Sequence, residues 1–311
     1  MTCSIVIRAY NEAAHLPRLF QGLRSQTIKD IEVILVDSGS NDSTVEVAQA
    51  QGARLVSILP GEFTFGRSLN LGMQTATNEL VVIASAHVYP VYPDWLESLL
   101  RPFQDEQVAL TYGKQRGPAT AKFSERQIFQ QWYSDLSVPR QATSFCNNAN
   151  AAIRRRLWQE NPYDEGLTGL EDLAWAKWAM EQGYAISYAA EAEVIHVHHE
   201  TPRAVFNRYR REAMAFKHIH PEAHFNLYDF LRLTFTNILS DMRHAAQERV
   251  LGKSLASILW FRYMQFHGTR LGYKDSGLIT PQLRETFYYA RTTGTATPSR
   301  REVEPIHYPE E

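Results

Sequence analysis

Polar side chains that could bind a ligand or move a proton stand at the ends of apolar segments in the first third of the chain. Asn11 and Glu12 follow one such segment, Asp37 ends a second, and Ser85 and His87 follow a third. Carboxylates, amides and imidazoles can accept hydrogen bonds, hold a cation or transfer a proton. Capping of a following helix is the competing structural role for Asn11, Glu12 and Asp37.

An acidic pair further along the chain is a candidate for proton transfer. Glu171 and Asp172 begin a predicted helix after the loop 166–169. A carboxylate at a helix start is kept ionised by the helix dipole, and an ionised carboxylate can act as a general base. The alternative is a pair of helix-capping carboxylates without chemistry.

Histidines near residue 197 add a possible metal site. In a strand, His196 and His198 lie on the same face, and neutral imidazole is a suitable ligand for Mn²⁺ or a related cation. One hypothesis is that His87 with His198 or His196 holds a divalent cation. The other is that His87 and Arg67 neutralise a phosphate group directly, because guanidinium matches phosphate oxygens. A solvated surface position for Arg67 and a core position for His87 are the structural alternatives.

The segments around these residues alternate between strand and helix patterns. Near-continuous apolar strands separated by helices predict an α/β domain with a mostly parallel sheet covered on both faces. Ligands bind beyond the carboxyl ends of such strands, where the polar residues above are expected. The segments 113–122 and 137–145 are expected to be irregular loops. The predicted strands are 4–8, 31–37, 54–58, 79–84 and 192–198, and the predicted helices are 13–26, 43–51, 67–76, 95–103 and 171–182.

The character of the chain changes near residue 201. Residues 202–219 and 226–270 have helical patterns, and the last twenty residues are rich in Thr, Ser, Pro and Glu, which favours disorder. We therefore expect three parts: 1–200, a helical extension at 201–291 and a disordered tail at 292–311. Basic side chains of the extension could meet a lipid diphosphate, an anionic membrane face or only solvent; they are Arg208, Arg210, Arg211 and Lys217. Its aromatic residues favour core packing, a homodimer interface or peripheral membrane contact, and the sequence leaves these open.

Composition excludes several classes of protein. The net charge is -2, so no overall field favours nucleic acid. Cys3 and Cys146 match neither a disulfide framework nor a metal knuckle and are expected to be buried thiols. Neither a secretory signal nor a stretch of 18 apolar residues occurs, which favours a cytoplasmic protein, in contact with the inner face of the membrane if the extension binds lipid.

Several motifs together resemble a known family. They occur in the order found in the family-2 inverting glycosyltransferases, and the resemblance covers roughly residues 3–200. The chain is most similar to bacterial transferases that build surface polysaccharides, including the rhamnosyltransferase-like group. The resemblance implies a GT-A fold, a single nucleotide-binding α/β domain. The motifs are Ser4–Glu12, Val36–Thr44, Phe65–Gly72, Val81–Trp95, Asn147–Arg154 and Gly169–Leu173.

The resemblance also implies roles for individual residues. Asp37 would accept a hydrogen bond from the N3–H of uracil or thymine, and Asn11 and Glu12 would contact the ribose or base. Asp172 would be the general base, supported by Glu171. Asparagines 147, 148 and 150 would line the acceptor side, or serve only turn hydrogen bonds.

The chain departs from the family at the end of the fourth strand. The usual Asp-x-Asp, whose last carboxylate holds a cation on the diphosphate, is replaced by Ser85-Ala86-His87. The resemblance still predicts an inverting transfer from a UDP- or dTDP-activated sugar to a hydroxyl of a glycan or lipid-linked acceptor, with Mn²⁺ or Mg²⁺ as the candidate cofactor.

Two rival functions remain at this point. A non-catalytic nucleotide-sugar-binding protein is suggested by the missing Asp-x-Asp, and the retained Glu171 and Asp172 argue against it. A nucleotidyltransferase is expected to carry a Gly-rich loop after the first strand, and residues 8–14 contain no Gly. A dehydrogenase is disfavoured because no G-x-G-x-x-G follows that strand.

Overall fold

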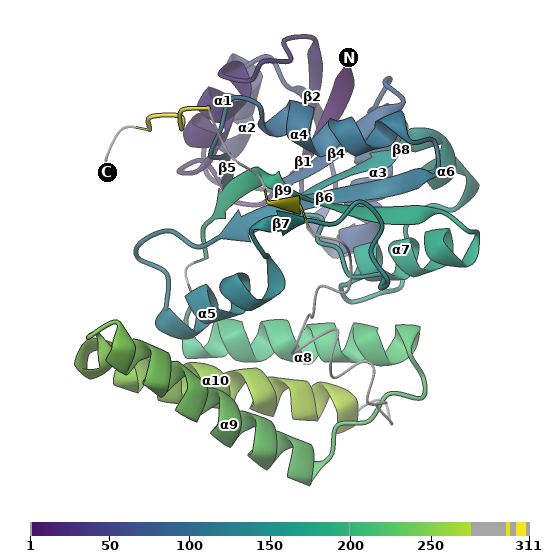
Figure 1. Ribbon diagram of the computed structural model, residues 1–311. Coiled ribbons are helices and arrows are strands. Elements are labelled where there is room, and N and C mark those ends of the chain that lie inside the picture. The colour runs from purple at the N-terminus through teal and green to yellow at the C-terminus, as the bar shows by residue number, and fades with distance from the viewer. Residues whose placement is uncertain (1, 199, 275–296, 299–302, 309–311) are drawn as a thin grey trace.

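The computed structural model describes residues 2–198, 200–274, 297–298 and 303–308 (Figure 1). A strand-rich domain occupies one end of the molecule, and three long helices occupy the other. The strands are β1 Cys3–Ala9, β2 Ile31–Asp37, β3 Arg54–Ser57, β4 Leu80–Ser85, β5 Val88–Pro90, β6 Val108–Arg116, β7 Leu136–Ser137, β8 Asn150–Arg154, β9 Ala185–His196 and β10 Thr297–Pro298.

One mixed sheet organises the domain. Its strand order is β3-β2-β1-β4-β8-β6-β9-β5, and the short β7 and β10 pair separately. β1 pairs in parallel with β2 and β4, so Ala9 lies beside Asp37 and Arg8 beside Ser85. β8 runs antiparallel to both β4 and β6. The predicted α/β fold is confirmed: the carboxyl ends of β1, β2 and β4 meet at one edge, where the sequence places its polar residues.

Helices cover both faces of this sheet. Because side chains alternate along a strand, Val6 packs with α3, α6 and α7 on one face while Ile5 and Ile7 pack with α1, α2 and α4 on the other. Both layers are closed to solvent. The helices are α1 Leu16–Arg24, α2 Thr44–Ala50, α3 Phe65–Thr75, α4 Trp95–Leu100, α5 Phe123–Trp132, α6 Arg155–Glu160, α7 Glu171–Glu181, α8 Pro202–Ile219, α9 Leu227–Gln247 and α10 Leu251–Lys274, with short 3₁₀ turns at Pro60–Glu62 and Arg101–Gln104.

Two predictions, an irregular loop at 113–122 and a strand at 192–198, are wrong in part. The segment 113–122 begins as the end of β6, and the helix α5 follows it directly. The strand predicted at 192–198 starts earlier, at Ala185. The sequence patterns did not predict β6 or the first part of β9, because these interior strands mix polar and apolar residues and are stabilised by pairing with each other.

The three C-terminal helices form a layer against the site edge of the domain. In Figure 1, α8 lies between the sheet and the pair α9 and α10. The predicted helical region 226–270 is divided by a turn, where Arg249 has a left-handed φ of 59°. Asp241 on α9 and Arg262 on α10 form a buried ion pair at 2.7 Å. Gly268 and Gly272 allow close packing of α10 on α8, since a Cβ at either position would lie within 2.4 Å of a backbone oxygen of α8.

Part of the predicted tail has defined contacts. The N–H of Ile306 donates to the carbonyl of Val91 at 2.9 Å, and the hydroxyl of Tyr308 donates to the carbonyl of Pro90 at 2.6 Å. The expectation of disorder therefore does not hold for residues 303–308, and most of the remaining tail lies outside the described residues. Both cysteines are buried free thiols, as predicted. Among the described residues, none of the helices combines the length and the apolar content needed to cross a bilayer.

Candidate active site

A cavity of about 600 Å³ opens at the site edge of the sheet. Its walls come from the ends of β1, β4 and β9, the start of α7, and one side each of α5 and α8. The volume is in the range of sites that bind small molecules. The sequence-predicted residues that line it are Asn11, Glu12, Ser85, His87, Asn147, Asn148, Glu171, Asp172, His196 and His198.

Glu12 and His87 form one side of the cavity. Nδ1 of His87 lies 2.8 Å from Oε1 of Glu12, and Oγ of Ser85 lies 3.0 Å from Nε2 of the same ring. Because a carboxylate accepts, Nδ1 carries the hydrogen, and the serine hydroxyl donates to Nε2. Glu12 therefore orients an imidazole with its side chain and does not cap the helix that follows.

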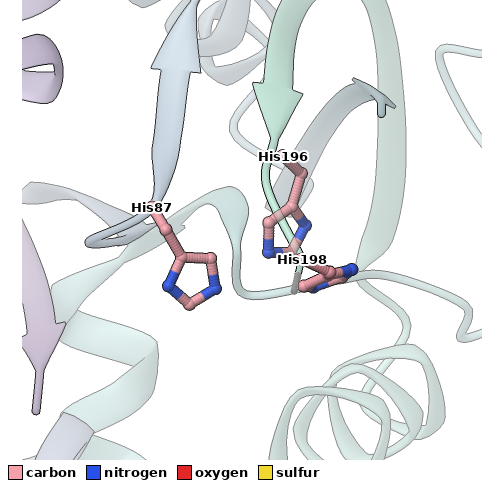
Figure 2. A group of neighbouring side chains, drawn as sticks. All are labelled: His87, His196 and His198. Atoms are coloured by element: carbon pink, nitrogen blue, oxygen red, sulfur yellow. The ribbon is translucent and has the colours of Figure 1, made fainter. Parts of the chain in front are cut away.

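His87, which follows β4, lies close to His196 and His198 at the end of β9 (Figure 2). The ring centroids of His196 and His198 are 4.0 Å apart, and that of His87 is 5.1 Å from His196 and 5.9 Å from His198. One nitrogen of each ring lies within 4.8 Å of those of the other two. The arrangement could hold a metal ion.

Each of these rings has an oxygen acceptor behind it. Nδ1 of His196 lies 2.7 Å from Oε1 of Gln115, and Nδ1 of His198 lies 2.6 Å from Oε1 of Glu125. Glu12 makes the same kind of contact with Nδ1 of His87. An oxygen on Nδ1 fixes the tautomer and leaves Nε2 as the ligand atom, which is the usual arrangement for metal-binding histidines. At His87, Nε2 accepts from Ser85, so a cation bound there would replace that hydrogen bond. Three residues far apart in sequence thus orient one triad.

The buried ring of His196 is held neutral. Burial, then the neighbouring His198 and His87 and the charge of Arg208, lower the pKa of His196 well below its usual range. A neutral imidazole has the lone pair that a metal needs. The triad therefore fits a cation, and three imidazoles suit a transition metal better than Mg²⁺, which prefers oxygen ligands.

A second group of possible ligands, Glu125, His198 and Glu200, lies next to the triad. Arg208 stands among them: its Nη1 lies 2.7 Å from Oε1 of Glu200 and 3.3 Å from Nδ1 of His198. Nδ1 of His198 is closer to Glu125 than to Arg208, so it carries the hydrogen and donates to the Glu125 carboxylate. Because Arg208 pairs with Glu200 and Glu125 contacts His198, this group is a network of ion pairs and hydrogen bonds beside the triad.

Asp172 begins α7 at the cavity wall. Its Oδ2 accepts from the backbone N–H of Asn148 at 2.9 Å, and its Oδ1 from that of Leu173 at 2.8 Å. Burial and the adjacent Glu171 raise the pKa of Asp172 to about 7, against the two hydrogen bonds and Arg8, which lower it. A carboxyl group with a pKa near neutrality and a fixed position is suited to accept a proton.

Two arginines that the sequence did not single out for this role face the same carboxylates. Nη1 of Arg8 lies 3.5 Å from Oε1 of Glu171. The guanidinium groups of Arg8 and Arg211 both stack on the ring of Phe65, at 4.9 and 4.5 Å from its centroid. Arg211 and its neighbour on α8, Arg208, both line the cavity. The interpretation of these two residues as part of a solvated helix face is therefore wrong.

Asp37 and Arg67 do not line the cavity. Both carboxylate oxygens of Asp37 accept from the N–H groups of the turn at Gly39 and Ser40. Arg67 pairs instead with Glu62 at 3.2 Å and Glu165 at 3.5 Å. The geometry therefore gives no support to a phosphate contact by Arg67. Arg8, Arg208 and Arg211 line the cavity instead.

Other predicted residues have structural roles. Asn150 is fully buried and joins Trp95 to the carbonyls of Lys114 and Ala192. Trp175 packs in the core, with its Nε1 donating to the carbonyl of Asn161. Asn150 therefore serves structural hydrogen bonds at the start of β8, while Asn147 and Asn148 line the cavity.

Sequence reasoning missed Gln115, Glu125 and Arg8. Arg8 had a usable signal, because it precedes Asn11 and Glu12 at the same strand end. Gln115 and Glu125 had none, since Gln115 lies in the segment 113–122, which was expected to be irregular, and Glu125 lies in a helix that the sequence patterns did not predict.

Comparisons with known proteins agree with this geometry. Residues 4–160 match the family Glycosyl transferase family 2. The chain is 28% identical over 222 residues to the O-antigen chain rhamnosyltransferase RfbN of Salmonella typhimurium, covering 67% of this chain and 70% of that one. It is 27% identical over 219 residues to the O-antigen chain rhamnosyltransferase WbaN of Salmonella anatum, covering 66% and 69%.

A solved structure has the same fold. The mannosyltransferase PcManGT of Pyrobaculum calidifontis, solved in complex with GDP-Man and Mn²⁺, is similar with a TM-score of 0.58 and 18% identity, covering 87% of this chain and 84% of that one. The family match spans half of the chain and includes the strands that form the site edge. The chain belongs to glycosyl transferase family 2, and it is a glycosyltransferase.

Proposed function

We propose that this chain is an inverting glycosyltransferase that moves a sugar from a nucleoside-diphosphate donor to a hydroxyl of a surface polysaccharide or its lipid-linked precursor. The observation that carries the proposal is one cavity that contains both a fixed carboxylate, Asp172, and three imidazoles suited to a metal ion, those of His87, His196 and His198. Similarity to two O-antigen chain rhamnosyltransferases supports the class of product.

Asp172 is the proposed general base. The acceptor oxygen attacks the anomeric carbon on the face opposite the diphosphate and gives its proton to the Asp172 carboxylate as the new C–O bond forms. The bond to the diphosphate breaks, and its electron pair leaves with the nucleoside diphosphate, so the configuration inverts. The backbone N–H groups of Asn148 and Leu173 fix the carboxylate in position, because each donates to one of its two oxygens.

His87, His196 and His198 are the residues that would hold a divalent cation, with Mn²⁺ a better candidate than Mg²⁺ for this ligand set. When bound, such an ion offsets negative charge on a departing diphosphate. The chain itself contributes the orientation of the three rings, through Glu12, Gln115 and Glu125. Arg208 lies beside this wall and adds fixed positive charge.

Donor recognition is proposed for the loop of Asn11 and Glu12 with Asp37. Asn11 has a left-handed φ of 57°, its Oδ1 accepts from the N–H of Asn41, and its own N–H donates to Ser40. The loops after β1 and β2 are therefore joined, and Asp37 at the base of the second loop retains lone pairs for a pyrimidine N3–H. We propose UDP or dTDP as the nucleotide.

The test is an activity screen with a panel of UDP-, dTDP- and GDP-sugars, with and without Mn²⁺, scored by release of nucleoside diphosphate. Release with a UDP- or dTDP-sugar, lost on chelation and in a His196→Ala variant, supports the whole proposal. Activity only with a GDP-sugar overturns the base assignment to Asp37. If removal of divalent cations by a chelator leaves the activity unchanged, the proposed metal role of the three histidines is overturned.

A non-catalytic nucleotide-sugar-binding protein is the second candidate. It is suggested by the departure at Ser85-Ala86-His87 from the family's usual carboxylates. Binding of a nucleotide sugar without release of diphosphate in the same screen, with a lipid-linked acceptor present, would favour it.

A further inference from the structure

The outer surface of α9 and α10 is unusually apolar. Twelve large apolar side chains are exposed among the described residues, and eight of them lie on these two helices. They form the apolar face of the α9–α10 pair: Leu227, Tyr228, Leu231, Phe235 and Leu239 on α9, and Leu255, Leu259 and Tyr263 on α10.

The spacing makes these side chains continuous stripes. Leu231, Phe235 and Leu239 follow at steps of four residues along one side of α9, and Leu255, Leu259 and Tyr263 do the same on α10. The opposite side of α9 is the one that packs into the molecule, with buried residues including Leu233, Asn237 and Asp241. The apolar face of the α9–α10 pair therefore points away from the rest of the chain.

Basic residues accompany this face. Residues 227–274 contain seven Lys or Arg and three Asp or Glu. Asp229 and Asp241 are buried, and Glu248 pairs with Arg126 at 2.9 Å, so little negative charge reaches the surface. Arg243, Arg249 and Lys253 are exposed around the turn between the helices. An apolar face bordered by lysines and arginines is typical of helices that lie on an anionic membrane.

We propose that the α9–α10 pair docks this chain on an anionic lipid surface, with its apolar face in the headgroup region. A second copy of the chain is the other occupant that such a face could take. Two-fold packing of this face would bring the same basic residues toward one another, and no acidic cluster on the face would compensate them. An anionic bilayer complements both the apolar stripes and the charge.

Docking in this orientation would place the active site close to the membrane. α8 carries Arg208 and Arg211 into the cavity on one side and packs against α10 on the other, where Gly268 meets the carbonyl of Phe206. Packed helices are about 8–10 Å apart, so the cavity lies roughly two helix layers from the lipid surface. A diphosphate group at that surface could reach it on a short segment of glycan.

The proposal is tested by co-sedimentation of the full chain with vesicles, without any sugar donor. The probes are phosphatidylcholine vesicles and mixed phosphatidylcholine–phosphatidylglycerol vesicles. The test variant is L231E/F235E, and the control is Leu59→Glu, which changes a leucine outside the helix pair that is at least as exposed as Leu231 and Phe235. A third variant, R243Q/K253Q, removes charge without touching the apolar stripes. Thermal melting of each variant confirms that it is folded.

We expect the wild type and Leu59→Glu to bind the anionic vesicles, L231E/F235E to bind about tenfold less or not at all, and R243Q/K253Q to bind less and with a weaker dependence on salt. Equal binding of wild type and L231E/F235E overturns the proposal, as does failure of the wild type to bind anionic vesicles. A concentration-dependent dimer that L231E/F235E converts to monomers, without vesicle binding, assigns the face to a second copy. Glycosyl transfer is not measured in this assay, so its result is separate from that of the proposed function.

Discussion

Glu12 and His87, 75 residues apart, meet at 2.8 Å between Oε1 and Nδ1, at the carboxyl ends of neighbouring strands β1 and β4. The contact joins the loop expected to bind the nucleotide to the ring that stands in place of the family's usual carboxylate. It also repeats in kind at His196 and His198, which meet Gln115 and Glu125. The triad is thus oriented by three residues, Glu12, Gln115 and Glu125, that are not themselves its members.

Replacing Asp172 by Asn should lower the transfer rate by about a hundredfold to ten-thousandfold, because the amide cannot accept the acceptor's proton. Nucleotide affinity should change little. Turnover and nucleotide affinity, measured on the same preparation, check both statements. Glu181→Gln, an exposed change at the other end of α7, is the control and should retain activity. Full turnover in Asp172→Asn would remove this residue from the mechanism.

The rate should depend on pH through Asp172. The base acts when ionised, and its pKa is raised to about 7, so kcat/KM should fall as the pH decreases through that value. Arg8 lowers this pKa. Arg8→Gln should therefore move the acidic limb of the profile to higher pH, while Arg8→Lys, which keeps the charge, should move it less. An unshifted limb in Arg8→Gln would show that another group controls it.

Glu125 should matter for metal binding without being a ligand. Glu125→Ala removes the acceptor behind His198 and should weaken the affinity for Mn²⁺ by about tenfold to a hundredfold. Glu125→Gln keeps an oxygen acceptor and should weaken it less. Calorimetric titration with Mn²⁺ measures both, and exposed Glu106→Gln serves as the control. Equal affinities in all three variants would contradict the orienting role.

Close packing of α8 on α10 should depend on glycine. A Cβ at Gly272 would lie 2.3 Å from the carbonyl oxygen of Arg210, so Gly272→Ala should lower the free energy of unfolding by about 1–3 kcal/mol. Gly252→Ala, on the same helix with no atom within 4 Å of the added carbon, should instead stabilise by about 0.5–1 kcal/mol. Denaturant titration measures both. Equal effects of the two substitutions would show that the α8–α10 contact is not limiting.

Local patterns in the sequence were sufficient to predict the four parallel strands β1 to β4. The strands at 31–37 and near 4–8, 54–58 and 79–84 follow from continuous apolar runs, and their parallel pairing brings Glu12 and His87 to one edge. These predictions succeed because apolar periodicity and strand ends are properties of short segments. The family resemblance supplied the proposed role of Asp172, and the structure supplies its fixed position.

Only the tertiary structure decided which side chains form the site. Arg67 and Arg208 are both basic residues on helices, yet Arg67 pairs with Glu62 and Glu165 outside the cavity and Arg208 lies inside it. Gln115 and Glu125 contact the histidines of the triad because β6 and α5 pack beside the end of β9. These contacts join residues 81 and 73 positions apart, and the free energy that brings them together comes from burial of the whole domain. The spacing of residues in the sequence does not predict these long-range contacts.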